Sequence, residues 1–382
     1  MGGGAMWERL VGQETAVAML RGAIDAGRVG HAYLFAGPEG VGRELAARAL
    51  AAALNCPEGG CGTCGVCARI ARGAHPDVWE IHAQGEQILV EQVREVRQAA
   101  YRSPVEGRAK VFVLQAAHRL NPSAANALLK VLEEPPSDVV FVLVSGSPED
   151  LLPTLVSRCR RVDFFPLGPG DVARILVEQH DADPGEAEAA ARTGGNVARA
   201  LLFLKDASAA ARRARHVEIP GRLVKGGPWD AVAIAAEIEA EAEAARDALA
   251  ARQKDELATY LDSFGDARGT ATARKRMEDR HKRELRRAET VAFDSALADV
   301  ASFYRDALLL GAGAPPEVLV NAEMRDRLGR AAAAVDRAWL VKALGAIEQT
   351  RRALQRSAQP LLALEALFMM LGRPRASKVA RA

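Results

Sequence analysis

The sequence predicts an α/β domain built on a parallel sheet, followed by a small helical lid and an all-α domain. Up to about residue 165, short apolar runs alternate with helical segments, which is typical of a parallel sheet covered on both faces. Prolines and glycines at residues 166–170 interrupt this pattern. Beyond them the periodicity is helical. Aromatic residues make up only 5% of the chain, which suits helices better than an all-β fold.

The expected strands and helices follow from these apolar runs. Strands are expected at residues 31–36, 110–115, 138–144 and 161–165, and helices at residues 43–54, 123–132 and 148–156. The domain boundaries are expected to give an α/β domain over residues 1–166, a lid over 167–205, a helical domain over 206–372 and a flexible tail over 373–382.

Composition limits the function classes. The chain has 382 residues, of which 49% are hydrophobic, and a net charge of +2, so its total charge favours neither a nucleic acid nor a membrane as partner. The longest apolar stretch, residues 361–371, is too short to span a bilayer. Residues 1–6 lack the basic and apolar regions of a signal peptide. We therefore expect a soluble cytoplasmic protein.

A long helical hairpin is predicted over residues 235–310, with charge of opposite sign on its two arms. The first arm carries the acidic residues Glu237, Glu239, Glu241 and Glu243. On the second arm, four arginines at helical spacing share one face: Arg276, Arg280, Arg283 and Arg287. Pairing with the acidic arm is the favoured interpretation of this face. Contact with a DNA phosphate backbone is the alternative.

Four of the five cysteines lie within twelve residues, at Cys56, Cys61, Cys64 and Cys67. Two disulfides packed this tightly would be strained, and they are unusual in a reducing compartment. Four thiolates around one tetrahedral zinc ion fit the spacing better. The sequence predicts a structural zinc module at residues 56–67, with metal-free thiols as the alternative.

A glycine-rich loop at residues 37–42 lies between a predicted strand and a predicted helix, which is the context of a phosphate-binding loop. The loop keeps its glycines, Gly37, Gly40 and Gly42. However, Arg43 occupies the position of the usual lysine, and Glu44 that of the Mg²⁺-binding hydroxyl. The next strand ends in Gln115 and Ala116, where carboxylates would orient Mg²⁺ and water. We expect a degenerate loop that binds neither ATP nor Mg²⁺ and has no ATPase activity.

Several motifs, taken in their order along the chain, resemble one family. They are Leu10-Val-Gly-Gln13, His31-Ala-Tyr-Leu-Phe-Ala-Gly37, the four-cysteine module, Asn126-Ala-Leu-Leu-Lys-Val-Leu-Glu-Glu-Pro135 and Leu152-Pro-Thr-Leu-Val-Ser-Arg-Cys159. Together they resemble the clamp-loader branch of AAA+ proteins, and most of all its delta-prime members in bacterial DNA polymerase III. The resemblance covers about residues 7–205. Beyond these, only helical character agrees, and the hairpin is longer than in a compact collar domain.

This resemblance implies a function. Residues 1–166 would form a degenerate AAA+ domain, and residues 206–372 the collar through which subunits assemble. Arg158 would be an arginine finger that reaches the nucleotide of a neighbouring subunit in trans. The chain would be a non-hydrolysing part of a DNA-directed DNA polymerase holoenzyme. Its partners would be gamma/tau-type ATPase and delta-type subunits, with the sliding clamp and primed DNA reached through the assembly.

Two other functions stay open at this point. The first is an active AAA+ ATPase of the gamma/tau type that uses Arg43 in place of lysine. The second is a nucleic-acid-binding module that uses the zinc knuckle and the basic face of the hairpin. The sequence alone does not decide whether nucleotide sits passively in the loop.

Overall fold

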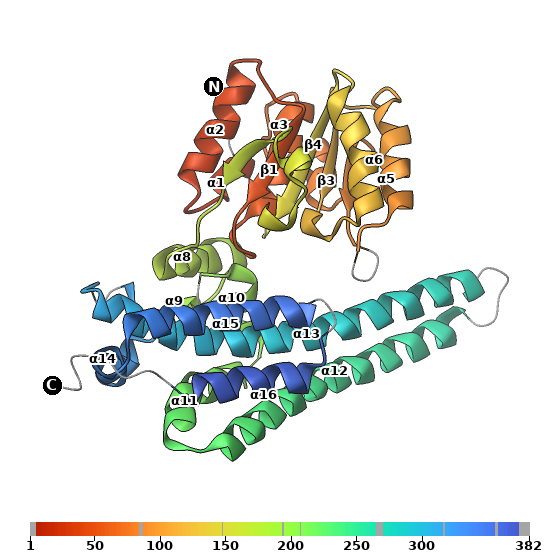
Figure 1. Ribbon diagram of the computed structural model, residues 1–382. Coiled ribbons are helices and arrows are strands. Elements are labelled where there is room, and N and C mark those ends of the chain that lie inside the picture. The colour runs from red at the N-terminus through yellow and green to blue at the C-terminus, as the bar shows by residue number, and fades with distance from the viewer. Residues whose placement is uncertain are drawn as a thin grey trace. The chain divides into compact units, whose positions relative to one another are not determined.

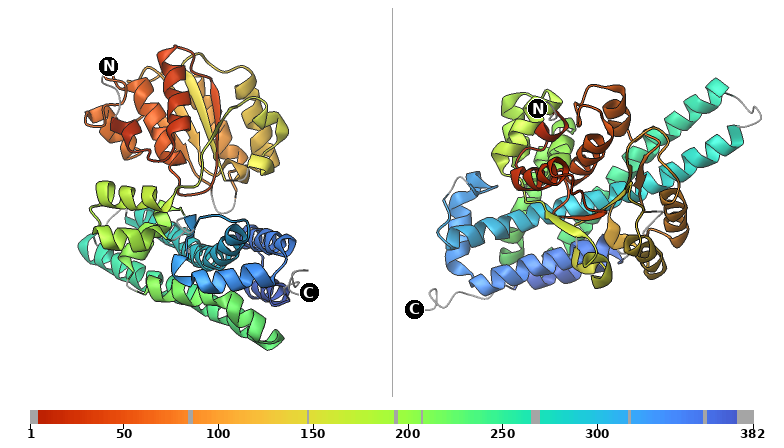
Figure 2. Two further views of the ribbon diagram at one scale, coloured as in Figure 1. Left: turned by 90° about the vertical axis from the view of Figure 1, so that its left-hand side faces the viewer. Right: turned by 90° about the horizontal axis from the view of Figure 1, so that it is seen from above.

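The protein is described here by a computed structural model of residues 5–83, 87–146, 148–192, 195–206, 208–264, 270–315, 318–355 and 358–373. The chain divides into two compact units (Figures 1 and 2). Each unit has apolar clusters of its own. The first comprises residues 1–191 and 195–204, and the second residues 192–194 and 205–382.

A five-stranded sheet forms the centre of the first unit, with strand order β2-β3-β4-β1-β5. The strands are β1 (Ala32–Ala36), β2 (Val78–Ile81), β3 (Lys110–Leu114), β4 (Val139–Ser145) and β5 (Arg160–Asp163). All four pairings between neighbouring strands are parallel. The predicted parallel sheet is therefore confirmed, and it contains one strand, β2, that the sequence pattern did not predict.

Helices cover both faces of this sheet (Figure 1). The helices between the strands are α3 (Arg43–Asn55), α4 (Gly65–Ala71), α5 (Val90–Ala100) and α6 (Pro122–Glu133). Side chains of β1 alternate between two apolar clusters: Tyr33 and Phe35 pack in the cluster that contains α3, whereas Leu34 packs in the cluster that contains α5 and α6. This alternation explains why the central strands are apolar except for Lys110 at the start of β3 and Ser145 at the end of β4.

Short elements complete the first unit. They are α1 (Ala5–Glu8), α2 (Glu14–Asp25), α7 (Pro153–Val156), α8 (Pro169–His180), α9 (Pro184–Ala191) and α10 (Val197–Lys205). Apolar side chains of α8 and α9 join the same core cluster as α3. The helix predicted at residues 148–156 is instead a 3₁₀ turn, Pro148–Asp150, followed by α7. Pro153 stands at the start of α7, a position that tolerates proline because the first turn lacks a backbone acceptor.

The second unit is helical in its described residues. Its α-helices are α11 (Ala209–Lys225), α12 (Pro228–Phe264), α13 (Thr270–Gly311), α14 (Arg325–Ala334), α15 (Arg337–Gln355) and α16 (Pro360–Leu371). One apolar cluster joins these helices. Across the described parts of the chain, no helix combines the length and the apolar character needed to cross a membrane.

Helices α12 and α13 lie side by side and extend beyond α15 and α16 (Figures 1 and 2). Along this extension polar side chains join the two helices. Gln253 Nε2 donates to Glu284 Oε2 at 2.8 Å, and Glu256 Oε2 lies 3.2 Å from His281 Nε2. The apolar core of the unit reaches along α12 to Ala242. Polar pairing therefore joins the two helices beyond the described apolar core.

Acidic residues of the first hairpin arm pair with α11 in this structure. Arg222 donates to both carboxylate oxygens of Glu237, each at 2.7 Å. Glu241 Oε2 lies 2.8 Å from His216 Nε2. The expected pairing between the acidic arm and the arginine face thus gives way, at these two residues, to pairing with another helix.

His216 lies buried between two carboxylates. Its Nδ1 is 3.1 Å from Asp299 Oδ2, and its Nε2 contacts Glu241. Burial alone would lower the pKa of His216, but the hydrogen bonds and charges of Asp299 and Glu241 raise it above its ordinary value. The imidazolium form therefore stabilises the second unit.

We expect the second unit to lose stability as the pH rises from about 6 through the raised pKa of His216. A group whose pKa is higher in the folded state stabilises fully below its unfolded pKa, about 6.5, and loses this contribution on deprotonation. Chemical denaturation at pH 6 and pH 9 measures the change. The variant His216→Gln should be less stable at pH 6 by about 3 kcal/mol, because it removes the positive charge that lies between the carboxylates of Asp299 and Glu241. Identical pH profiles for both proteins would contradict this assignment.

Candidate functional site

The glycine-rich loop at residues 37–42 connects the end of β1 to the start of α3, at the carboxyl edge of the sheet. Gly40 has a φ of 75°, in the left-handed region that favours glycine. A Cβ atom at Gly40 would lie 2.1 Å from Asn196 Oδ1, and the backbone N–H of Val197 donates to Gly40 O at 3.2 Å. The loop is therefore tightly turned, and residues at the start of α10 contact it closely.

Arg43, the first residue of α3, has a buried side chain that is only 3% exposed. Within the described residues, its Nε and Nη1 have no hydrogen-bond partner, and its Nη2 lies 3.9 Å from Glu44 Oε1. Burial lowers the pKa of Arg43, and the charges of Glu44 and Glu39 partly oppose this. A buried guanidinium at a helix N-terminus can hold an oxyanion, whereas the neighbouring Glu44 opposes one.

Neutral side chains occupy the ends of β3 and β4. Gln115 and Ala116 follow β3, and Ala116 has a φ of 52°. His118 Nδ1 lies 3.1 Å from Ser145 Oγ at the end of β4. The structure thus brings together two residues that are 27 positions apart in the sequence. None of these groups is the anionic oxygen ligand that Mg²⁺ prefers.

Arg158 follows α7 and is held by two acceptors. Its Nη2 donates to Glu133 Oε1 at 2.7 Å, and its Nη1 donates to Thr154 O at 2.9 Å. The side chain is 36% exposed, so part of it faces solvent. Cys159, the next residue, carries a thiol whose pKa burial raises to about 12, which makes it unreactive. Because part of the Arg158 guanidinium is exposed, it can bind an anion from outside this chain.

The four clustered cysteines converge in space. Their Sγ atoms all lie within 4.8 Å of one another, with Cys56 3.7 Å from Cys61 and 3.6 Å from Cys64. Four sulfurs bound to one tetrahedral zinc ion are about 3.8 Å apart, because each Zn–S bond is about 2.3 Å. All four cysteines are free thiols. The cluster can hold a metal ion, and its donor set and spacing are consistent with zinc.

The protonation chemistry of this cluster also favours a cation. Backbone N–H groups of Thr63 and Cys64 lower the pKa of Cys61 to about 6. By contrast, burial and the neighbouring sulfurs raise the pKa of Cys67 to about 12. Four thiolates at these distances repel one another, and a divalent cation at their centre would compensate that repulsion.

Buried polar side chains attach the cysteine segment to the loop that precedes β3. Asn55 Oδ1, at the end of α3, accepts from the backbone N–H groups of Arg108 and Ala109. Asp77 is fully buried, and its carboxylate accepts from the backbone N–H groups of Val105, Glu106 and Gly107. The cysteine cluster therefore sits on a rigid base.

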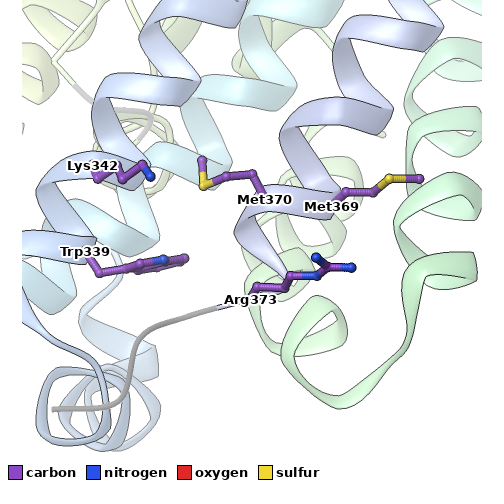
Figure 3. A pocket seen from close by; sticks show the side chains of 5 residues that line it. All are labelled: Trp339, Lys342, Met369, Met370 and Arg373. Atoms are coloured by element: carbon purple, nitrogen blue, oxygen red, sulfur yellow. The ribbon is translucent and has the colours of Figure 1, made fainter.

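The second unit also contains a hollow between α15 and α16, with a volume of about 340 Å³. Its lining combines apolar and basic side chains: Trp339, Lys342, Met369, Met370 and Arg373 (Figure 3). Trp339 and Lys342 come from α15, and Met370 faces them from α16, whereas Met369 points away from α15 (Figure 3). These residues include no carboxylate, histidine or thiol, so they offer no acid–base pair.

Two of the sequence predictions lie outside the described residues. The side chains of Arg276, Arg280, Arg283 and Arg287 are not among those that the structure describes, and neither are residues 374–382 of the predicted tail.

Comparisons with known proteins agree with the resemblance seen in the motifs. Residues 12–168 match the family described as DNA polymerase III, delta subunit. The gamma/tau subunit of Mycobacterium tuberculosis is 38% identical over 224 residues, which are 56% of this chain and 39% of that protein. The delta' subunit of Bacillus subtilis is 35% identical over 210 residues, which are 54% of this chain and 64% of that protein. The chain thus spans less than two thirds of these relatives.

The solved structures that match this chain do so with low TM-scores and low sequence identity. A DNA polymerase III gamma-subunit-related protein from Thermotoga maritima gives a TM-score of 0.38 at 17% identity, covering 93% of this chain and 99% of its own. The RuvB Holliday junction branch migration motor of the same organism gives 0.40 at 16% identity, covering 58% and 80%. The family match and the sequence relatives, rather than these structures, confirm the resemblance: residues 12–168 match the family described as DNA polymerase III, delta subunit, and the similar proteins include gamma/tau and delta' subunits of DNA polymerase III.

Proposed function

We propose that this chain is a cytoplasmic, non-hydrolysing clamp-loader subunit of the delta-prime type. It would occupy one position in a ring of AAA+ subunits and donate Arg158 to the nucleotide site of a neighbouring gamma/tau-type ATPase. Delta-type subunits, the sliding clamp and primed DNA would be further partners in the assembly. The chain would contribute a fixed framework and a finger, while a partner would contribute ATP and Mg²⁺.

One observation carries the non-hydrolysing part of this proposal. The position where a phosphate-binding loop needs a lysine and a hydroxyl holds the buried Arg43 and the carboxylate of Glu44. At the end of β3, Gln115 and Ala116 supply no charge to orient Mg²⁺ or water. Phosphoryl transfer depends on positioning and on charge stabilisation. A loop with these replacements would keep the shape of a phosphate-binding loop but would not support ATP hydrolysis.

The cysteine cluster would hold a structural zinc ion in this proposal. All four donors come from the protein, so a tetrahedral ion would keep no open position for a substrate. Its contribution would be to fix α4 and the preceding loop against the end of α3. The free thiols agree with a reducing cytoplasm.

A gamma/tau-type ATPase is the second candidate function, and the 38% identity to gamma/tau subunits favours it. In that case Arg43 would act in place of the lysine, and carboxylates from elsewhere in the chain would hold Mg²⁺.

A titration of the isolated chain with ATP, with and without Mg²⁺, separates these two functions. We expect no Mg²⁺-dependent binding at millimolar ATP, because the loop combines Glu44 with neutral residues at the metal positions. Isothermal titration calorimetry measures this binding directly, without the need for a neighbouring finger. Micromolar binding that requires Mg²⁺ would overturn the non-hydrolysing proposal and favour the gamma/tau type. The variant Glu44→Ser is a matched control, since it restores the missing hydroxyl and should strengthen any residual binding.

A further inference from the structure

We propose that Glu133 is a positioning residue for the Arg158 guanidinium, an inference that rests on the finger role proposed above. Glu133 belongs to the Leu-Glu-Glu-Pro segment that ends the motif at residues 126–135. Neither the fold nor the proposed function explains why a glutamate stands at this position. The two residues are 25 positions apart, and they meet only because α6 ends beside α7.

The backbone holds Glu133 at a defined place. At the start of α6, the side chain of Asn121 caps the helix by accepting from the backbone N–H of Ala124 at 2.7 Å. At the other end, Glu133 is the last helical residue, and Glu134 leaves the helix with a φ of −130° and a ψ of 67°. Pro135 then prevents the helix from continuing. The carboxylate of Glu133 therefore projects from a helix whose two ends are fixed.

The guanidinium of Arg158 is bound from two sides. Glu133 accepts from Nη2, and the backbone carbonyl of Thr154 accepts from Nη1. Each of these nitrogens carries two N–H groups, so one contact to each does not use up the donors of the planar fork. An arginine side chain has many rotamers, and two acceptors on different elements select a narrow set of them. Arg158 is thus oriented before a phosphate arrives.

The charge of Glu133 has a second, opposing effect, since a carboxylate beside the guanidinium also repels a phosphate. Glu133 is 50% exposed, and water screens the charges of exposed groups strongly. Water does not remove the orienting effect of the hydrogen bond between Glu133 and Arg158 in this way. We therefore expect orientation to outweigh repulsion, so that removal of the carboxylate slows the reaction at the neighbouring site.

Steady-state ATP hydrolysis by the reconstituted assembly tests this inference through a double-mutant cycle. The four proteins are the wild type, Glu133→Ala, Arg158→Ala and the double variant. We expect Glu133→Ala to lower the kcat of the partner ATPase about tenfold with little change in KM, because misplacing a catalytic group affects the transition state more than substrate binding. In the Arg158→Ala background the same change should have no further effect.

Two further variants make the test specific. Glu133→Gln keeps an oxygen that can accept from Arg158 Nη2, and it should restore most of the lost kcat. Asp163→Ala removes the partner of another exposed arginine, Arg161, whose Nε lies 2.7 Å from Asp163 Oδ1. This control should leave turnover unchanged. Thermal unfolding and assembly of each variant are measured first, and we expect both to be unaffected because these side chains are exposed.

The possible failures can be told apart. If Arg158→Ala itself leaves turnover unchanged, the finger role is wrong. If Arg158→Ala lowers turnover but Glu133→Ala does not, only the positioning role is wrong. A rise in turnover on Glu133→Ala would mean that the carboxylate acts as a competitor of phosphate, which also overturns positioning. An additional loss in the Arg158→Ala background would mean that Glu133 acts through another group.

Discussion

Replacement of Arg158 by alanine is expected to lower ATP turnover by the reconstituted assembly by about 10³-fold or more, which is the usual effect of removing an arginine finger. The reason is electrostatic: in phosphoryl transfer, negative charge on the transferring group must be stabilised by donors that are already in place. The isolated chain should keep its fold, because Arg158 is 36% exposed and its contacts lie at the surface. Single-turnover and steady-state hydrolysis by the assembly, measured with and without the substitution, would give the effect.

Two variants serve as controls for this prediction: one changes a neighbouring arginine, and the other replaces Arg158 by lysine. Arg161→Ala removes a second exposed arginine only three positions away and should leave turnover unchanged. Arg158→Lys keeps the charge but loses the planar fork, so it should recover little activity if the phosphate is bound by two N–H groups. Turnover within twofold of the wild type in the Arg158→Ala assembly would remove the finger from the proposed function. The chain would then act only as a structural member of its assembly.

The central strands of the sheet could be predicted from the sequence, and the edge strand β2 could not. Strands β1, β3 and β4 are buried on both faces, and each therefore contains a run of at least four consecutive apolar residues. By contrast, β2 is a four-residue edge strand that contains the polar Glu80 and the 39%-exposed Trp79. Arg48 of α3 donates to both oxygens of Glu80, which gives this polar residue its place beside the core. An apolar pattern cannot reveal a strand that is stabilised in this way.

In the candidate site, too, features formed by residues close together in the sequence could be predicted, whereas contacts between residues far apart in the sequence could not. Spacing along the chain predicted the cysteine cluster, because all four residues lie in one short segment. The glycine loop was predicted for a similar reason. The contact between Glu133 and Arg158 joins two elements, and so does the ladder of hydrogen bonds around Asp77. Single-sequence patterns carry no signal for such pairs.

Loss of metal from the cysteine cluster is expected to destabilise the first unit by about 4 kcal/mol or more, because loss of a structural metal is among the few changes with effects of this size. For a unit of this size, this corresponds to a fall of about 10 °C in the midpoint of thermal unfolding. We expect the purified chain to contain about one zinc ion, measured by elemental analysis. A strong chelator should remove it together with part of the helical signal of α4.

The variant Cys64→Ser separates the metal from the helix cap. Cys64 is the N-cap of α4, and its sulfur accepts from the backbone N–H of Cys67 at 3.4 Å. Serine is a favourable N-cap but a poor zinc ligand, so the cap survives while the metal site does not. Any large loss of stability in Cys64→Ser therefore comes from the metal. Cys159→Ser changes the one cysteine outside the cluster and should keep the zinc content at one. If Cys64→Ser retained both zinc and stability, the cluster would be a group of ordinary thiols, and the packing around α3 and α4 would have to hold this segment without a metal.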